Sequence, residues 1–317
     1  MSLELLHSPQ AYQRGPIQDI SHGSIHWQSR GIEVHIQRED LVFPELSGNK
    51  WRKLRYNLEE AVSSGHQQIL SFGGAFSNHI HALAHAGSKI GLKTIGVIRG
   101  EELADQPLNP TLQQAASLGM KLVFVSRKEY ALKSDPLWIA ELQDRWGKSY
   151  VLPEGGNNNL AVRGCAEILG PESARYTHIA VAVGTGGTLC GLLQGTQNTD
   201  QKILGFWALK GMNPAEEVRI FGSSIQGVLF DQYHWGGYAK SQPELIEWIN
   251  RFYQVTQVPL DPIYTGKVLY GIEDLARKGW FSPKDRILVI HTGGLQGNAG
   301  FNQRCVQQKS PTLTYEI

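Results

Sequence analysis

The sequence has few cysteines, no excess of charge of one sign and no long apolar run, and each of these absences excludes a class of protein. Its three cysteines form no C-x-x-C pair, so neither a disulfide framework nor a structural zinc site is expected. The 30 basic and 29 acidic residues leave a net charge of +1, which provides no electrostatic footprint for nucleic acid or an anionic membrane.

No stretch approaches the roughly 18 apolar residues of a membrane span. The first residues, MSLELLHSPQ, lack the basic start and apolar core of a signal peptide. We therefore expect a globular protein of the cytoplasm.

Short apolar runs alternate with longer amphipathic stretches along the chain. The expected strands are Gln68–Phe72, Thr94–Ile98, Leu122–Val125, Ser149–Leu152, Ile179–Val183, Ile203–Trp207 and Ile287–Ile290. The expected helices are Lys53–Ser63, Asn78–Ile90, Asn109–Leu118, Pro136–Trp146, Leu160–Leu169, Thr188–Gln197, Pro243–Tyr253 and Lys267–Lys278. Strand–helix alternation predicts an α/β fold with parallel sheets covered by helices.

At roughly 150 residues per domain, 317 residues suggest about two domains. Turns rich in glycine and asparagine near residues 48–50 and 153–159 are the best candidate boundaries. We expect a small α/β domain of residues 52–155, inserted into a large cofactor-binding domain of residues 1–51 and 156–317.

Glycine is abundant, with 35 residues, and the glycines cluster in loops. One cluster lies between a β-branched strand and an apolar helix: Gly184, Thr185, Gly186, Gly187 and Thr188. Close-approaching backbone amides, hydroxyl groups and a helix N-terminus predict a phosphate-binding loop. No Gly-Lys-Ser/Thr follows, and Leu189 takes the third glycine position of the dinucleotide fingerprint, so the loop matches neither nucleotide motif. The alternative is a tight turn without a ligand.

Two other glycine-containing loops follow strands. The segment Gly73-Gly74-Ala75-Phe76-Ser77-Asn78-His79 presents three polar side chains at a helix start. It is suited to hold a carboxylate or a ring oxygen, although helix capping by Ser77 or Asn78 is the simpler interpretation. The segment His291-Thr292-Gly293-Gly294 follows the last strand; by itself it is most simply a strand-terminating turn.

Three basic residues, Lys50, Arg52 and Lys53, stand at the start of the first long helix. Cations there oppose the helix dipole, and an anionic cofactor would offset the repulsion. A lysine combined with a phosphate loop suggests a Schiff base with pyridoxal phosphate. The alternative is a solvated basic surface.

Five motifs stand in one order along the chain: Gly48-Asn49-Lys50-x-Arg52-Lys53-Leu54, Gly73-Gly74-Ala75-x-Ser77-Asn78-His79, Gly184–Thr188, Asp261-Pro262-Ile263-Tyr264-Thr265-Gly266-Lys267 and His291-Thr292-Gly293-Gly294. From Pro16 to Gly294 the chain resembles the 1-aminocyclopropane-1-carboxylate deaminase / D-cysteine desulfhydrase family of pyridoxal-phosphate enzymes. The resemblance implies a tryptophan-synthase-β-like fold (pyridoxal-phosphate fold type II) with two three-layer, parallel-sheet domains, and a homodimer.

The resemblance also implies roles for individual residues. Lys50 is the Schiff-base lysine and the base at the substrate Cα. Lys53 and the Gly184–Thr188 loop hold the cofactor's phosphate, and Asn78 hydrogen-bonds its phenolic oxygen. Ser77, Asn78 and His79 face the substrate, in particular its carboxylate.

Two tyrosines and two threonines complete the implied site. Tyr264 matches a tyrosine of the family's D-P-x-Y motif, and Tyr238 matches a second active-site tyrosine less closely; either one protonates the leaving group. Deaminases of the family have Y-E-G-K and H-L-G-G where this chain has Thr265 and Thr292. A hydroxyl near the pyridine nitrogen leaves the ring closer to neutral than a carboxylate would.

These threonines favour the desulfhydrase branch: a lyase that eliminates sulfide and ammonia from D-cysteine or a related small amino acid to give pyruvate. The alternative is a 1-aminocyclopropane-1-carboxylate deaminase, which opens the ring to give 2-oxobutanoate and ammonia. Trp51, where deaminases usually have threonine, and the loosely matching segment 155–164 leave the substrate open. Outside this class, the alternatives are a nicotinamide-dependent oxidoreductase and a non-catalytic ligand-binding relative.

His81 and His85 stand one helical turn apart, the spacing of a metal-binding pair. No HExxH glutamate accompanies them. We therefore expect hydrogen-bonded helix histidines and no metal.

Overall fold

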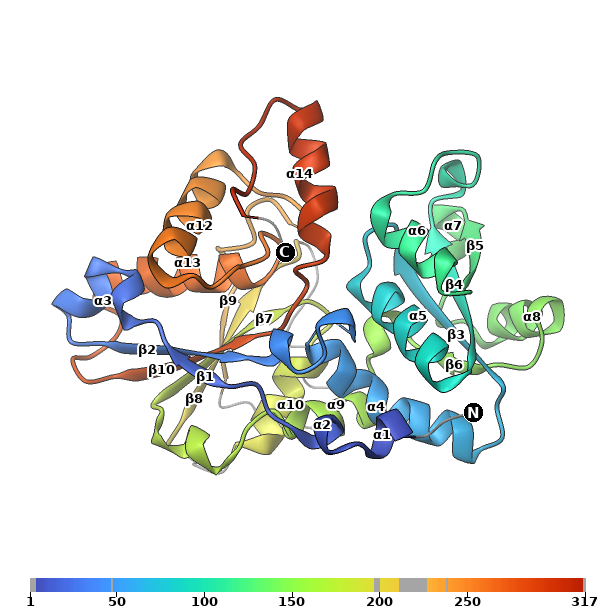
Figure 1. The fold of residues 1–317 in the computed structure, drawn as a ribbon, viewed down its shortest axis with the longest axis horizontal. Helices are drawn as coiled ribbons and strands as arrows, with labels where there is room; N and C mark the ends of the chain where they lie inside the picture. The colour runs from blue at the N-terminus through green and yellow to red at the C-terminus, as the bar shows by residue number, and fades with distance from the viewer. Residues whose placement is uncertain (1–3, 47, 197–199, 211–226, 238, 316–317) are drawn as a thin grey trace. The chain divides into compact units, whose positions relative to one another are not determined.

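The computed structural model describes residues 4–46, 48–196, 200–210, 227–237 and 239–315. The chain divides into two compact units (Figure 1). Unit 1 comprises Met1–Gln13 and Lys50–Gly164, and unit 2 comprises Arg14–Asn49 and Cys165–Ile317. The expected large domain of 1–51 and 156–317 differs from unit 2 at both of its internal boundaries and at its start, because residues 50–51, 156–164 and 1–13 group with the 52–155 segment.

Helix α4 (Asn49–Ser63) holds the backbone of Ala11 and Gln13, which explains why this segment groups with unit 1. Trp51 Nε1 and an Arg55 guanidinium nitrogen both donate to the Ala11 carbonyl oxygen, each at 3.2 Å. Arg52 donates to the carbonyl oxygen of Gln13. Arg52, one of the three basic residues at this helix start, thus hydrogen-bonds a backbone carbonyl of its own unit.

Unit 1 is built on a parallel sheet of order β5-β4-β3-β6. Its strands are β3 (Gln68–Gly74), β4 (Lys93–Arg99), β5 (Lys121–Val125) and β6 (Tyr150–Leu152). On one face Leu70, Phe72 and Val97 pack with Trp138 and Leu142 of α8. The other face is covered by α5, which carries Ile80 next to Gly73 and Gly96. The unit therefore has three layers.

The helices of unit 1 are α1 (Glu4–His7), α2 (Pro9–Tyr12), α4, α5 (Asn78–Ile90), α6 (Pro110–Ser117), α7 (Arg127–Tyr130), α8 (Pro136–Trp146) and most of α9 (Asn159–Ala166).

Unit 2 contains a six-stranded sheet of order β1-β2-β10-β7-β8-β9, in which only the β1–β2 pair is antiparallel. Its strands are β1 (Ile17–Asp19), β2 (Glu33–Arg38), β7 (His178–Val183), β8 (Lys202–Trp207), β9 (Gly227–Phe230) and β10 (Arg286–His291). Its helices are α3 (Ile25–Ser29), α10 (Gly187–Gly195), α12 (Pro243–Thr256), α13 (Thr265–Arg277) and α14 (Gly297–Gln307).

Successive side chains along a strand point to opposite faces of this sheet. Phe206 packs beneath α13, where a Cβ on Gly271 would meet its ring at 2.5 Å, while neighbouring Gly205 faces Leu189 of α10. The main core lies on the side of α12 and α13, which Figure 1 shows above the sheet.

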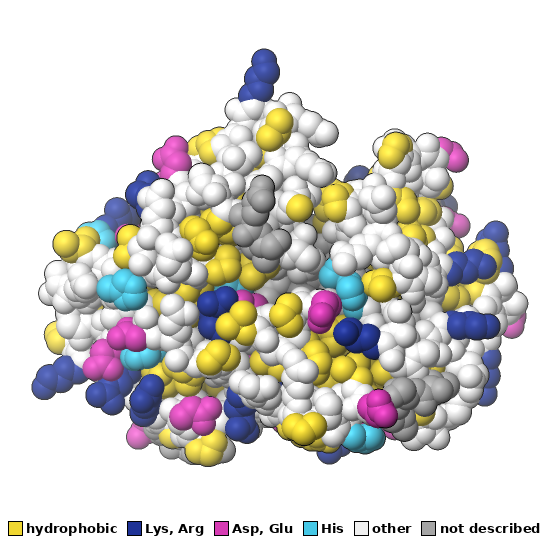
Figure 2. All heavy atoms as spheres, in the orientation of Figure 1, with side chains coloured by type: hydrophobic (Ala, Val, Ile, Leu, Met, Phe, Trp, Pro, Cys, Tyr) yellow, Lys and Arg dark blue, Asp and Glu magenta, His cyan; other side chains and the backbone are white. Residues whose placement is uncertain are grey.

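The expected alternation of strands and helices is confirmed, and every strand and helix predicted from the sequence is present, most with ends within two residues. None of the helices in the described part of the chain is long and apolar enough to cross a membrane. On the face drawn in Figure 2, basic and acidic side chains are interspersed.

Helices α9 and α4 approach each other closely at Gly164, and this contact allows a stability prediction. A Cβ built on Gly164 would lie 1.9 Å from the Arg52 carbonyl oxygen. We predict that Gly164→Ala lowers the free energy of unfolding by about 1–3 kcal/mol or more, because the helices must separate. Gly74→Ala is the control, since its Cβ would meet only an Arg99 nitrogen at 3.8 Å. Urea denaturation measures both, and equal effects of the two substitutions would contradict the prediction.

Candidate active site

Residues 48 and 49 are tied to two glycine loops of unit 2. The Asn49 amide donates to the Thr292 carbonyl oxygen (3.2 Å), and its side-chain Nδ2 donates to Thr188 Oγ1 (2.8 Å). Gly48 has φ +58°, and a Cβ there would lie 2.7 Å from the same Thr292 oxygen. Only glycine satisfies both conditions without strain. Lys50 is the next residue in the chain, so its Cα lies about 3.8 Å from that of Asn49.

The Gly184–Thr188 loop ends strand β7 and starts helix α10. Gly186 adopts a left-handed conformation (φ +82°) at the N-cap and provides no side-chain cap. The first bond of the helix runs from the Cys190 amide to the Gly186 carbonyl. The preceding amides of the first turn have no acceptor within the helix, and together with the helix dipole they form a site suited to an anion. The residues present therefore fit a phosphate group.

The Asp261–Lys267 motif places Tyr264 beside this loop. A Cβ on Gly184 would lie 3.6 Å from the Tyr264 ring and 3.9 Å from its hydroxyl oxygen. The Asp261 carboxylate accepts hydrogen bonds from the amides of Ile263, Tyr264 and Thr265 (2.7–3.0 Å), so it caps helix α13. This cap fixes the backbone from which the Tyr264 side chain extends.

The two predicted threonines differ in what their hydroxyl groups do. Thr265 is fully buried and donates its hydroxyl hydrogen to Asp261 (2.6 Å). The Thr292 hydroxyl has no hydrogen-bond partner among the residues that the structure describes. For a role near a pyridine nitrogen, Thr292 is therefore the stronger candidate, and the role of Thr265 stays a prediction.

His291 positions the Thr292 loop, a contribution that the sequence did not indicate. Its ring is fully buried. Nδ1 accepts from the Gly293 amide (3.2 Å), so Nε2 carries the hydrogen and donates to the Pro259 carbonyl oxygen (2.8 Å). Both ring nitrogens therefore hold backbone on either side of the loop.

In unit 1 the residues Ser77, Asn78 and His79 begin helix α5. The Ser77 hydroxyl accepts from the Ile80 amide (3.3 Å), so it caps the helix as the simpler interpretation required. Asn78 is the first helical residue. The loop before it is fixed by Asn109, whose Nδ2 donates to the Ala75 carbonyl oxygen (2.9 Å).

The His79 ring lies inside unit 1, with 2% of its surface exposed. Ser71 donates to the Leu152 carbonyl oxygen (2.8 Å) and accepts from His79 Nε2 (2.8 Å), which fixes the ring tautomer. Burial, followed by the positive charges of Lys50 and Lys53, lowers the pKa of His79 to about 3. The imidazole is therefore neutral at any working pH. A direct substrate contact of this ring stays a prediction.

Lys53 lies in the same part of unit 1. It is 4% exposed, and its Nζ donates to the Gly155 carbonyl oxygen at 3.4 Å. The next residue, Gly156, faces the His79 ring, since a Cβ there would be 2.9 Å from the ring carbon Cε1. The electrostatic effect of Lys50 and Lys53 on His79 places both amines near this ring. Unit 1 thus brings together Lys50, Lys53 and His79.

Trp51, the departure from the deaminase pattern that left the substrate open, lies inside the protein. It is fully buried, and its indole nitrogen is bonded to the Ala11 carbonyl oxygen. Tyr238, the second predicted tyrosine, lies outside the described residues.

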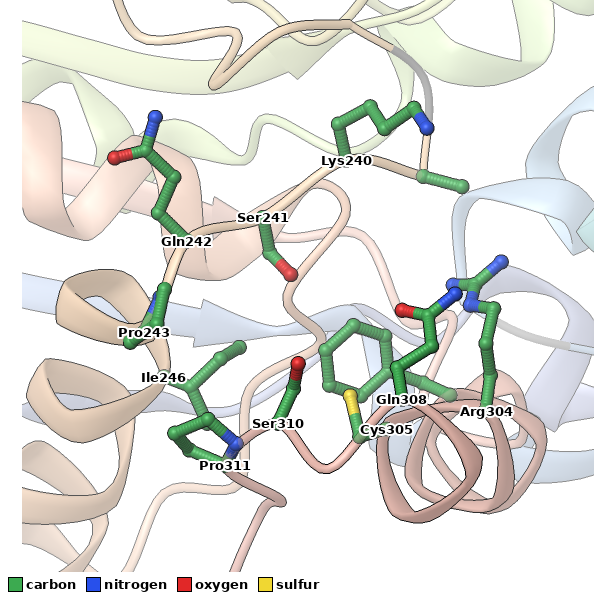
Figure 3. Close-up of a pocket in the computed structure, with 12 residues that line it drawn as sticks. Lys240, Ser241, Gln242, Pro243, Ile246, Arg304, Cys305, Gln308, Ser310 and Pro311 are labelled. Atoms are coloured by element: carbon green, nitrogen blue, oxygen red, sulfur yellow. The ribbon is translucent and has the colours of Figure 1, made fainter.

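A cavity of about 130 Å³ is lined in part by residues that follow Tyr238 in the sequence (Figure 3). Its wall is formed by residues 239–243 and by helix α14 with the segment that follows it, and Lys240 and Arg304 stand on opposite sides of it. None of the described site residues predicted from the sequence lines this cavity.

The rings of His81 and His85 are neighbours, with centroids 4.6 Å apart. His81 Nε2 is hydrogen-bonded to Gln114 (2.9 Å), as expected of a helix histidine. In the described ranges, no group of three or more histidine, cysteine or acidic side chains is arranged to hold a metal ion.

Comparison with known proteins identifies the family. A family model described as pyridoxal-phosphate dependent enzyme matches residues 10–293. A putative 1-aminocyclopropane-1-carboxylate deaminase of Pyrococcus horikoshii is 33% identical, over 86% of this chain and 88% of its own. A bifunctional, mitochondrial D-cysteine desulfhydrase/1-aminocyclopropane-1-carboxylate deaminase of Arabidopsis thaliana is 32% identical, over 84% of this chain and 73% of its own.

A solved structure, that of an ACC deaminase homologue, superposes with a TM-score of 0.79 at 31% identity and covers 93% of this chain and 94% of its own. This likeness confirms the expected fold type II architecture, and the family match confirms pyridoxal phosphate as the cofactor against the nicotinamide alternative. The chain therefore belongs to the pyridoxal-phosphate-dependent enzymes, in the family that contains the 1-aminocyclopropane-1-carboxylate deaminases and the D-cysteine desulfhydrases.

Proposed function

We propose that this enzyme is a lyase that converts D-cysteine, or a related small amino acid with a good β-leaving group, to pyruvate, sulfide and ammonia. The observation that carries the proposal is the Asn49–Thr188 hydrogen bond. It fixes the residue before Lys50 on the loop whose amides suit a phosphate. The similarity to the Arabidopsis relative, which is named a D-cysteine desulfhydrase as well as a deaminase, supports this chemistry.

In this proposal Lys50 carries the cofactor through its Nζ. Lys53 and the Gly184–Thr188 loop bind the phosphate, and Asn78 donates to the phenolic oxygen. Bound pyridoxal phosphate supplies an electron sink for the charge left at the substrate Cα. His79 beside the lysines is neutral and adds no further positive charge to the site.

The substrate steps belong to residues of this chain. Ser77, Asn78 and the start of helix α5 bind the substrate carboxylate, aided by the helix dipole. Lys50, once substrate has replaced it on the cofactor, accepts the Cα proton at Nζ. Tyr264 or Tyr238 gives a proton to the departing sulfur, so that it leaves as neutral hydrogen sulfide. Water then replaces the nitrogen, and pyruvate and ammonia are released.

The choice of the desulfhydrase branch rests on the hydroxyl groups at 265 and 292. A neutral hydroxyl near the pyridine nitrogen stabilises a protonated ring less than a carboxylate would. A weaker electron sink suffices to expel a thiolate, whereas opening a cyclopropane demands more. Since the Thr265 hydroxyl is bonded to Asp261, Thr292 is the group proposed to face the ring nitrogen. We extend the proposal to a homodimer in the cytoplasm, as expected from the sequence.

The covalent anchor provides the first test. We predict that borohydride reduction of the purified holoenzyme leaves a pyridoxyl group on Lys50, because that amine is the proposed carrier. Peptide mass spectrometry locates the adduct. Lys50→Ala should lose turnover by a factor of about 10³ or more, while Lys89→Ala, on the exposed end of helix α5, keeps it. An adduct on another lysine would refute the assignment.

The substrate branch provides the second test. We predict that D-cysteine gives pyruvate with a kcat/KM at least tenfold above that for ring opening of 1-aminocyclopropane-1-carboxylate. Thr292→Glu should shift this ratio toward ring opening, because a carboxylate favours the protonated pyridine ring. Pyruvate and 2-oxobutanoate are separated by chromatography. Faster ring opening by the wild type would instead establish the deaminase alternative.

The Asn49–Thr188 hydrogen bond provides the third test. Asn49→Ala removes a bond worth about 1 kcal/mol, so we predict roughly fivefold weaker cofactor binding when the apoenzyme is titrated with pyridoxal phosphate. Asn302→Ala is the matched control: it removes asparagine bonds to the Leu313 backbone elsewhere in unit 2. An unchanged affinity in Asn49→Ala would show that this bond does not support the site.

A further inference from the structure

Unit 2 contains a buried cation that the proposed chemistry does not use. Lys267, in the first turn of helix α13, has 1% of its surface exposed. Its Nζ lies 2.9 Å from the His234 carbonyl oxygen, 3.0 Å from that of Gly237 and 3.5 Å from that of Ala208. An ammonium group has three N–H donors and no acceptor capacity, so its capacity matches these three carbonyls.

The three carbonyls belong to two segments that are distant in the sequence. Ala208 follows strand β8, and its amide donates to the Val183 carbonyl oxygen (3.0 Å), immediately before the Gly184 loop. His234 and Gly237 belong to a turn of residues 234–237. Lys267 therefore joins this turn and the end of β8 to the helix that begins beside Tyr264.

The 234–237 turn has a backbone that needs external support. Trp235 has φ +55°, and Gly236 and Gly237 also have positive φ. A left-handed conformation is unfavourable for a tryptophan, and it persists only where surrounding contacts determine it. The Trp235 ring packs edge-on against Tyr270 of α13, with centroids 4.9 Å apart. The Lys267 ammonium provides the polar part of the same support.

A neutral polar side chain would be less costly to bury than this lysine. Burial lowers the pKa of Lys267 to about 8, and the charge of Asp261 opposes the decrease. The joined segments also carry the titratable groups His234, Lys210 and Tyr264, and Tyr233 beside the turn donates to Asp274 of α13 (2.7 Å). A Cβ on Gly237 would lie 3.1 Å from the Lys210 Cβ. Retention of a cation at such a position indicates that its three donors are needed.

We propose that Lys267 is a positioning residue for the elimination reaction: its ammonium group holds the 234–237 turn and the end of strand β8 against the start of helix α13, and thereby fixes Tyr264 beside the Gly184 loop. The proposal rests on the proposed function for its effect on turnover. The clamp itself is independent of that function, because all of its atoms belong to unit 2.

The experiment compares three variants of the full-length holoenzyme. Lys267→Met keeps the length of the side chain and removes the donors. Lys267→Arg keeps a charge at every accessible pH. Lys278→Met is the matched control, because Lys278 lies at the end of the same helix with 62% of its side chain exposed, in a surface ion pair with Asp274. Hydrogen exchange, kcat, KM and the pH dependence of kcat are measured for each.

For Lys267→Met we expect faster amide exchange confined to residues 208–210 and 232–242. We expect kcat to fall about 10- to 100-fold with little change in KM, since misplacement by about 1 Å can cost about 100-fold. Wild-type kcat should decrease as the pH rises through about 8, and Lys267→Arg should move this decrease to higher pH. If Lys267→Met does not fold, the pH profile of Lys267→Arg decides alone.

Either of two results would overturn the proposal: local exchange and kcat in Lys267→Met equal to those in Lys278→Met, or an unchanged alkaline limb in Lys267→Arg. If the wild type shows no turnover with any tested amino acid, the proposed function fails. The exchange comparison then still tests the clamp, so the two failures are distinguishable.

Discussion

The hydrogen bonds of Asn49 are the constraint on which the proposed site depends. They join the start of helix α4 to the loops that follow strands β7 and β10. These strands are parallel neighbours, so their carboxyl ends lie together, at the edge where open α/β sheets bind ligands. One asparagine thus fixes the position from which the Lys50 side chain extends. Gly48 makes the approach possible because any side chain there would collide with Thr292.

The basic start of helix α4 illustrates how one sequence feature serves two purposes. Arg52 and Arg55 donate to backbone carbonyls of residues 11 and 13, and the Arg55 guanidinium lies over the rings of Tyr12 and Tyr56 at 4.4 and 4.3 Å. Their cost against the helix dipole is offset within unit 1. Lys50 and Lys53 are the members of the run assigned to the cofactor. From the sequence alone, an anionic cofactor and a solvated basic surface both remained possible for this run.

Most strands with continuous apolar runs were predictable, although the short strand β9 (GVLF) was missed. Strands whose buried positions are polar were not predictable. Strand β2 was missed because its sequence, EVHIQR, reads as polar. Its buried Gln37 donates to the Ile168 carbonyl oxygen, and Arg38 pairs with Asp40 at 2.7 Å. These partners make the polar side chains less costly to bury, and no periodic pattern reveals them. Strand β1 is three residues long and pairs at the sheet edge. No local pattern distinguishes so short a strand from a loop.

The ordered motifs were enough to predict the fold, the cofactor and the candidate residues, but not the division of labour within a motif. In Asp261–Lys267, Asp261 caps the helix and Thr265 fixes Asp261. Gly266 has no side chain because Ile249 would be 2.4 Å from its Cβ. Lys267 clamps three carbonyls.

The side chains of Asp261, Thr265 and Lys267 all bond within the protein. Tyr264 is the polar side chain of the motif that lies beside the Gly184 loop. The position of Lys267 between Gly266 and Val268, at the start of an amphipathic helix, is the one sequence signal that could have indicated a buried cation. Most of the polar side chains of this motif therefore support the backbone of Tyr264, the proposed proton donor. A proton donor is useful only when the backbone that carries it is fixed.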